Sequence, residues 1–246
     1  MQIIQKELKV KNYTLRGLFS KPDGDFKTIV VMFHGFTGHM NENGYLFKQL
    51  TETLVGQGFA TLRYDFMGSG ISDGHFSDMT FFTEYEDGIE IVNEAYRLNN
   101  NTPVVLLGFS LGGAVASRVS LATKDKLEKL ILLSPAGHII NTFSNPFRLK
   151  PMDENGNVDM GGYYMNVKIR DTMVGYEMYK DIETFDRPVL IMQGSADQAV
   201  HPSHSKEYDD LYPNSKYVLV EGAEHCYTKV CYRDEVRKTV LAFVQE

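Results

Sequence analysis

The chain has 246 residues, of which 43% are hydrophobic and 23% charged, and its formal net charge is −7. This composition excludes a disordered chain, and the acidic balance provides no basic surface for nucleic acid. No apolar run approaches the roughly 18 residues that cross a bilayer, and the first ten residues lack the apolar core of a signal peptide, so we expect a soluble, cytoplasmic protein.

The chain begins with two β-like stretches, 3–10 and 13–19, which predict a hairpin. From residue 28 onward, short and continuously apolar runs predict strands buried on both faces of a parallel sheet. These runs are residues 28–33, 60–64, 103–107, 130–133, 189–192 and 217–220. Segments of helical length with mixed polar and apolar faces lie between them, at 45–57, 84–99, 111–123 and 234–244. The alternation predicts an α/β class, a mostly parallel doubly wound sheet with the hairpin as its antiparallel edge.

One segment, residues 138–181, interrupts this alternation because it has no buried-strand run and is too long for an ordinary connection. Its Tyr, Met and Phe content argues against a disordered loop. Asn155-Gly156 is a candidate for a tight hairpin turn. We therefore predict a single domain over residues 1–246, with residues 138–181 folded as an inserted cap over one end of the sheet.

The pattern G-x-S-x-G occurs at Gly108-Phe109-Ser110-Leu111-Gly112, directly after a predicted strand and at the start of a predicted helix. Such a sharp strand-to-helix turn exposes a nucleophile, and the two glycines remove side chains that would clash. The alternative is a serine that only caps the helix. The context favours Ser110 as a nucleophile.

A serine nucleophile needs a base, and the base needs an orienting acid. In this kind of sheet the order along the chain is serine, acid, histidine. His225 follows the last predicted strand through a short turn, and Asp197 follows the strand at 189–192, so both are expected at the carboxyl edge of the sheet. His201 and His204 are expected to be solvated, and Asp186, Asp209 and Asp210 are weaker candidates for the acid.

Acyl transfer also needs backbone donors for the developing negative charge. One is expected from the N–H of Leu111 and the other from the N–H of Phe36, in the glycine-containing loop His34-Gly35-Phe36-Thr37-Gly38-His39. For His34 itself we expect a structural role in holding this loop.

With HGFTGH, GFSLGG, GSADQAV and EHCY placed, the chain resembles the α/β-hydrolase superfamily, and most of all the small bacterial cinnamoyl and feruloyl esterases. Residues 34–39, 65–74 and 225–227 carry the second likeness. The resemblance implies Ser110, His225 and Asp197 as a catalytic triad, the Phe36 and Leu111 amides as the oxyanion hole, and a cap inserted after the sixth strand. Because the chain has no tryptophan, contacts to a substrate ring fall to tyrosine or phenylalanine. The expected substrate-binding residues are the tyrosines of the predicted cap: Tyr163, Tyr164, Tyr176 and Tyr179.

The expected function is a serine carboxylesterase that works through an acyl-enzyme on small hydroxycinnamate esters, without a cofactor. The alternatives are a monoacylglycerol lipase or thioesterase acting on acyl chains, and a non-catalytic binding protein on the same scaffold. The histidines and the two cysteines, Cys226 and Cys231, lack the spacing of a metal site, and we expect Cys226 to be a buried thiol. We expect no nucleic-acid or membrane partner, and the oligomeric state stays open, with a homodimer as one option.

Overall fold

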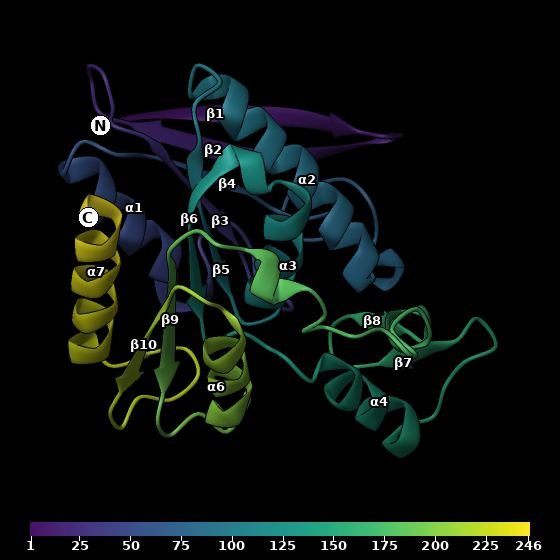
Figure 1. Cartoon of the computed structure of the whole chain (residues 1–246). Coiled ribbons are helices and arrows are strands. Elements are labelled where there is room, and N and C mark those ends of the chain that lie inside the picture. Colours follow the sequence, from purple (N-terminus) through teal and green to yellow (C-terminus); the bar gives the residue numbers. More distant parts are fainter.

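The apolar runs form the central sheet of the computed structural model, which describes residues 1–246 (Figure 1). The strands of this sheet are β1 (Gln2–Val10), β2 (Tyr13–Lys21), β3 (Ile29–Phe33), β4 (Ala60–Tyr64), β5 (Val104–Phe109), β6 (Leu127–Leu133), β9 (Val189–Gly194) and β10 (Ser215–Val220). Their order is β1-β2-β4-β3-β5-β6-β9-β10. The pairs β1–β2 and β2–β4 are antiparallel and all others are parallel. The predicted parallel sheet with an antiparallel edge hairpin is confirmed.

Both faces of the parallel strands are buried, which explains why these strands read as continuous apolar runs. In β5, Val104 and Leu106 join the hydrophobic cluster on one face. The alternate residues Val105, Leu107 and Phe109 join the cluster on the other face. Successive side chains of a strand point to opposite faces, so no position of β5 is left for a polar residue.

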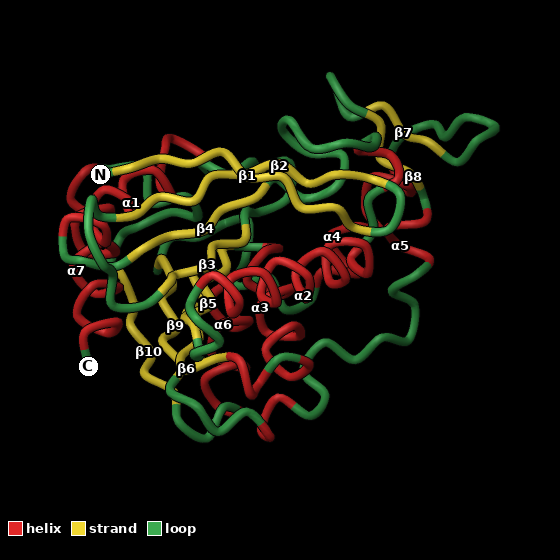
Figure 2. The backbone as a smooth tube through the Cα atoms, turned by 90° about the horizontal axis from the view of Figure 1, so that it is seen from above, coloured by secondary structure: helices red, strands yellow, loops and turns green.

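Five long helices cover the two faces (Figure 2). Helices α1 (Leu46–Gly56) and α7 (Val230–Gln245) pack on one face, and α2 (Phe81–Leu98), α3 (Leu111–Ala122) and α6 (Pro202–Leu211) pack on the other. Short 3-10 turns complete the connections: η1 (Asn43–Tyr45), η2 (Phe76–Asp78), η3 (Lys124–Lys126) and η4 (Ile182–Thr184). None of the helices combines the length and the apolar character that crossing a bilayer requires.

Residues 138–181, called the insert below, leave the sheet after β6 and return to it before β9. They contain α4 (Ile139–Leu149), a small hairpin of β7 (Asn157–Asp159) and β8 (Tyr164–Asn166), and α5 (Lys168–Asp171). Figure 1 shows these elements together beyond one side of the sheet. The turn expected at Asn155-Gly156 is present, but it closes a wider loop between the bridged residues Met152 and Val158. That the insert acts as a cap stays a prediction.

Candidate active site

Ser110 lies at the sharp turn between β5 and α3, with φ 54° and ψ −119°, a conformation that a residue with a side chain rarely adopts. A Cβ atom on Gly108 would lie 2.2 Å from the Gly112 carbonyl oxygen. A Cβ atom on Gly112 would lie 2.3 Å from the carbonyl oxygens of Phe33 and His34. The chain can make this turn only because both positions are glycine, and the turn holds the Ser110 hydroxyl above the end of the sheet.

Three side chains that the sequence places far apart form one hydrogen-bonded chain. The His225 Nε2 atom lies 2.9 Å from the Ser110 Oγ atom, and the His225 Nδ1 atom lies 2.7 Å from the Asp197 Oδ2 atom. Asp197 and His225 lie on the loops that follow β9 and β10, at the same edge of the sheet as the carboxyl end of β5. In this arrangement an imidazole bonded to a carboxylate can take the proton of a serine hydroxyl.

Asp197 is only 2% exposed, and its surroundings favour the ionised carboxylate. Burial alone would raise its pKa, but hydrogen bonds from His225, from the Val200 N–H and from the Gln193 amide reverse this effect and hold the pKa below its ordinary value. The Ala199 and Val200 N–H groups donate to Oδ1 at 2.9 and 2.8 Å. The acid is therefore kept charged and held in place.

Gln193 is a site residue that sequence reasoning missed. Its side chain is fully buried at the end of β9 and donates to the Asp197 Oδ2 atom at 2.9 Å. The Ser205 hydroxyl of α6 donates to the Gln193 Oε1 atom at 2.5 Å, which fixes the orientation of the amide. The available signal was one polar residue at the end of an otherwise apolar strand.

The N–H groups of Phe36 and Leu111 donate no hydrogen bond within the protein. Both residues line the same cavity as Ser110. The loop that carries Phe36 is held by Glu42, a second residue that the sequence analysis missed. Its buried carboxylate accepts the Gly35 N–H at 2.6 Å.

His34 lies beneath this loop, only 1% exposed. The His34 Nδ1 atom lies 2.9 Å from the Gly35 carbonyl oxygen, and Nε2 accepts the Phe66 N–H at 3.1 Å. Burial lowers the pKa of the ring, so it is neutral with its proton on Nδ1. These contacts tie the loop after β3 to the loop after β4, which is the structural role expected for His34.

Two cavities meet at Ser110 and His225. The first, of about 300 Å³, is mainly apolar, and Ile139, Phe143 and Met165 of the insert form part of its wall. The second, of about 380 Å³, is more polar and is lined by the loop at 35–39 together with Glu42 and Asn43. An ester carbon at Ser110 can therefore place one substituent in an apolar and the other in a polar environment.

None of the four predicted tyrosines lines either cavity. Tyr163 comes nearest, because its ring packs against Phe36 with 6.2 Å between centroids. Tyr164 is 56% exposed, Tyr176 packs against Phe81 and Phe82, and Tyr179 packs against Tyr208. The aromatic side chains on the cavity wall are instead Phe36 and Phe143.

Two further expectations are wrong in part. Cys226 is half-buried and lines the polar cavity beside His225, so it is not a fully buried thiol. His201 is exposed as expected, but His204 is half-buried, and its ring lies 4.6 Å from the ring of His138. His204 lies in the first turn of α6, a helix that packs against the sheet through Tyr208. The sequence of this helix is mostly polar, so it did not indicate that His204 would be partly buried.

The chain is similar to several known proteins. A model of the family described as serine aminopeptidase, S33, matches residues 24–154. An uncharacterized 31.7 kDa protein of Escherichia coli is 33% identical over 85% of this chain and 86% of its own length, and another match of that description spans 39% of the relative. Human monoglyceride lipase is 28% identical over 85% of this chain and 78% of the lipase. The structure of ferulic acid bound to Est1E from Butyrivibrio proteoclasticus has a TM-score of 0.85 and 25% identity, covering 98% of both chains.

Proposed function

The chain belongs to the serine aminopeptidase S33 family of α/β-hydrolases, and from that premise we propose that it is a carboxylesterase working through a serine-bound acyl-enzyme. The predicted α/β-hydrolase fold is confirmed by the same matches, and the class of activity is that of a serine hydrolase. The observation that carries the proposal is the hydrogen-bonded chain from Ser110 through His225 to Asp197 at a strained turn.

In the proposed reaction, His225 takes the proton of the Ser110 hydroxyl as its oxygen attacks the ester carbonyl carbon. The Phe36 and Leu111 N–H groups stabilise the resulting oxyanion, which lowers the activation free energy by several kcal/mol. His225 then gives the proton to the departing alcohol, leaving an ester of Ser110. Water, deprotonated by His225, releases the acid and restores the hydroxyl. Asp197 stabilises the imidazolium form of His225 throughout.

For the acyl group we propose a hydroxycinnamate. The apolar cavity has aromatic side chains, Phe36 and Phe143, next to Ser110, and its volume of about 300 Å³ suits one small aromatic acid. Ferulic acid is the ligand named for the Butyrivibrio neighbour. The polar cavity would then receive the alcohol.

A second candidate is a monoacylglycerol lipase or thioesterase. Met160 and Met165 in the apolar wall are flexible side chains that can adapt to an acyl chain. Human monoglyceride lipase is among the relatives. A non-catalytic binding protein is less well supported, because the serine, histidine and aspartate are all present and bonded to each other.

One substrate panel separates these candidates. We would measure kcat/KM for methyl ferulate, for p-nitrophenyl esters of increasing acyl length, and for a monoacylglycerol, with Ser110→Ala as the background. A carboxylesterase for hydroxycinnamates hydrolyses methyl ferulate well and loses efficiency with long acyl chains. If kcat/KM rises steadily with acyl length and methyl ferulate is inert, the hydroxycinnamate proposal is wrong and the lipase candidate replaces it. If no ester is hydrolysed, the non-catalytic binding protein is the candidate that remains.

A further inference from the structure

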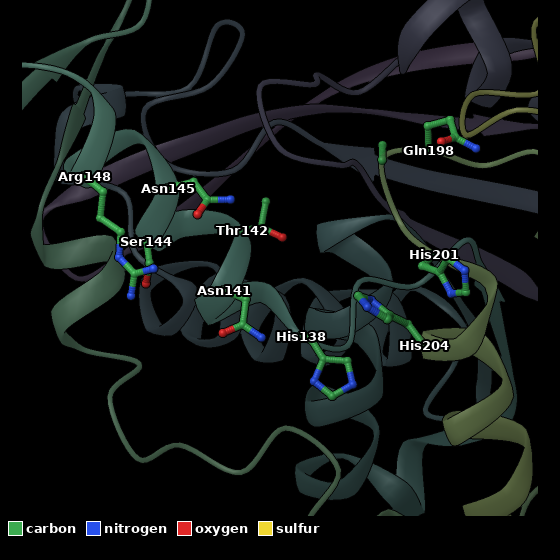
Figure 3. Close-up of a pocket in the computed structure, with 10 residues that line it drawn as sticks. His138, Asn141, Thr142, Ser144, Asn145, Arg148, Gln198, His201 and His204 are labelled. Atoms are coloured by element: carbon green, nitrogen blue, oxygen red, sulfur yellow. The ribbon is translucent and has the colours of Figure 1, made fainter.

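Helix α4 separates the apolar cavity from a larger polar cleft that the proposed reaction does not use. Ile139, Phe143 and Pro146 on one face of α4 line the apolar cavity. His138, Asn141, Asn145 and Arg148, spaced by three or four residues along the helix, line a cleft of about 700 Å³ (Figure 3). The two stripes give one helix an apolar and a polar wall.

The opposite wall of the cleft comes from the segment that joins β9 to α6. Gln198, Ala199 and His201 line it, together with His204 in the first turn of α6. Figure 3 shows Gln198 and His201 across an open space from Thr142 and Asn145, while His138 and His204 lie close together. Thr142 and Ala199 belong to the walls of both the cleft and the apolar cavity. The cleft therefore adjoins the apolar cavity at residues beyond Ser110 and His225, neither of which lines it.

The lining of the cleft offers hydrogen-bond donors and no carboxylate. Arg148 carries a permanent charge and forms no ion pair. The His201 Nδ1 atom accepts the Ser203 N–H at 3.2 Å, so the neutral ring has its proton on Nε2. The His204 Nδ1 atom is buried without a partner. The carboxylate bonded to a lining side chain is Glu207, 2.9 Å from the His138 Nε2 atom.

These features indicate the charge of a ligand. A donor-rich wall without acidic side chains favours an anion over an amine, and a single arginine suits one negative charge. The histidines are not arranged as a metal site, because no group of three or more His, Cys, Asp or Glu side chains could hold an ion.

We propose that the cleft binds a carboxylate at the far end of the acyl group, held by Arg148 and the neighbouring amides and imidazoles. Besides the hydroxycinnamates proposed above, the substrates would then include esters of acids with an apolar middle and a second, free carboxylate. The inference rests on the proposed esterase function, since the acyl group must reach the cleft from Ser110 through the apolar cavity.

The test compares two esters of equal acyl length. The acyl chain of p-nitrophenyl octanoate ends in a methyl group, and that of mono-p-nitrophenyl suberate ends in a carboxylate. The succinate, adipate and sebacate monoesters extend the series. In the wild-type protein we expect the carboxylate ester to be hydrolysed with the higher kcat/KM at an intermediate length. Arg148→Gln should lower the ratio of kcat/KM for suberate over octanoate about tenfold, as expected for the loss of a charged hydrogen bond.

Arg187→Gln is the matched control, since it removes the same charge from an exposed arginine outside the insert and should leave the ratio unchanged. A wild-type preference for octanoate at every length, or an equal effect of Arg148→Gln on both esters, would overturn the inference. Those results differ from failure of the esterase proposal, in which neither ester is hydrolysed or Ser110→Ala hydrolyses both.

Discussion

At the scale of single residues, the Asp197 carboxylate is controlled by a neighbour that never touches substrate. Gln193 donates to the same oxygen that binds His225, and Ser205 orients the Gln193 amide. This makes Gln193 a positioning residue: it favours the ionised acid and fixes the direction in which the acid presents its oxygen to the histidine.

Gln193→Leu should lower kcat/KM about tenfold, because a buried charged group loses a hydrogen bond. The pKa of Asp197 should rise, since the lost donor favoured the ionised form. With one donor fewer, the carboxylate should also attract the protonated His225 ring more strongly, so the acidic limb of the kcat/KM profile should move to higher pH. Ser205→Ala should shift it less in the same direction. If Gln193→Leu lowers kcat/KM by the same factor at every pH and the acidic limb does not move, Gln193 contributes only to packing.

His34 gives the opposite expectation. His34→Gln leaves the Phe66 N–H without its present acceptor, so we expect about 1–3 kcal/mol of lost unfolding free energy and a moderate fall in kcat. The pH dependence of kcat/KM should stay that of the wild type. Denaturant unfolding and pH profiles measure both effects. An intact stability combined with a loss as large as that of His225→Ala would make His34 a catalytic base instead.

At the scale of elements, the turn between β5 and α3 is set by backbone contact. Gly112→Ala would force a Cβ atom to 2.3 Å from two carbonyl oxygens, so we expect the turn to shift and the protein to lose about 1–3 kcal/mol or more, with most of its esterase activity. Gly24→Ala is the control, because its Cβ would meet nothing within 4 Å. Thermal unfolding and p-nitrophenyl acetate turnover would test this, and a Gly112→Ala protein as stable and active as Gly24→Ala would contradict it.

Helices and strands could be predicted from the sequence where their burial produces a run or a periodic pattern of apolar residues. The strand from Ala60 to Tyr64 has the predicted bounds. The strand that begins at Val189 continues two residues beyond the predicted apolar run. The prediction ended too early because Gln193 and Gly194 are buried but do not extend the apolar pattern. Helix α6 was largely missed because its sequence is polar, although Pro202 at its start and Tyr208 on its buried side are consistent with a helix.

The site residues that could be predicted are those that come shortly after a strand in the sequence. Ser110, Asp197 and His225 each come directly after a strand or a short turn, and parallel strands bring their carboxyl ends to one edge. The four tyrosines had no such constraint, since the faces of the insert depend on how it packs against the sheet. Gln193 and Glu42 were missed because a buried polar side chain that supports another residue has no motif.

At the scale of the whole molecule, Asp87 joins three separate segments. The Tyr13 hydroxyl of the edge hairpin donates to it at 2.7 Å, and the Met67 N–H of the loop after β4 donates at 3.0 Å. The residue is fully buried in α2. Burial raises its pKa from 3.8 to about 6, against the effect of these two donors.

A carboxyl whose pKa is higher in the folded than in the unfolded protein stabilises the fold fully below the unfolded pKa and loses that contribution as pH rises through the folded value. For Asp87 this window runs from about 4 to about 6. The stability cost of Asp87→Asn should therefore be larger at pH 4 than at pH 7, by about 1–3 kcal/mol. Denaturant unfolding of both proteins across this range measures the difference. A cost that grows with pH would show that Asp87 is stabilised in its charged form.

Ser110 is proposed as a nucleophile activated by His225 and Asp197, and covalent labelling tests this role most directly. The measurement is intact-protein mass spectrometry after exposure to a fluorophosphonate, which reacts with activated serines, followed by mapping of the modified peptide. The wild-type protein should gain one phosphonyl group on Ser110, and Ser110→Ala should gain none. A wild-type protein that stays unlabelled, or a Ser110→Ala protein that is labelled to the same extent, would show that Ser110 is not the activated nucleophile.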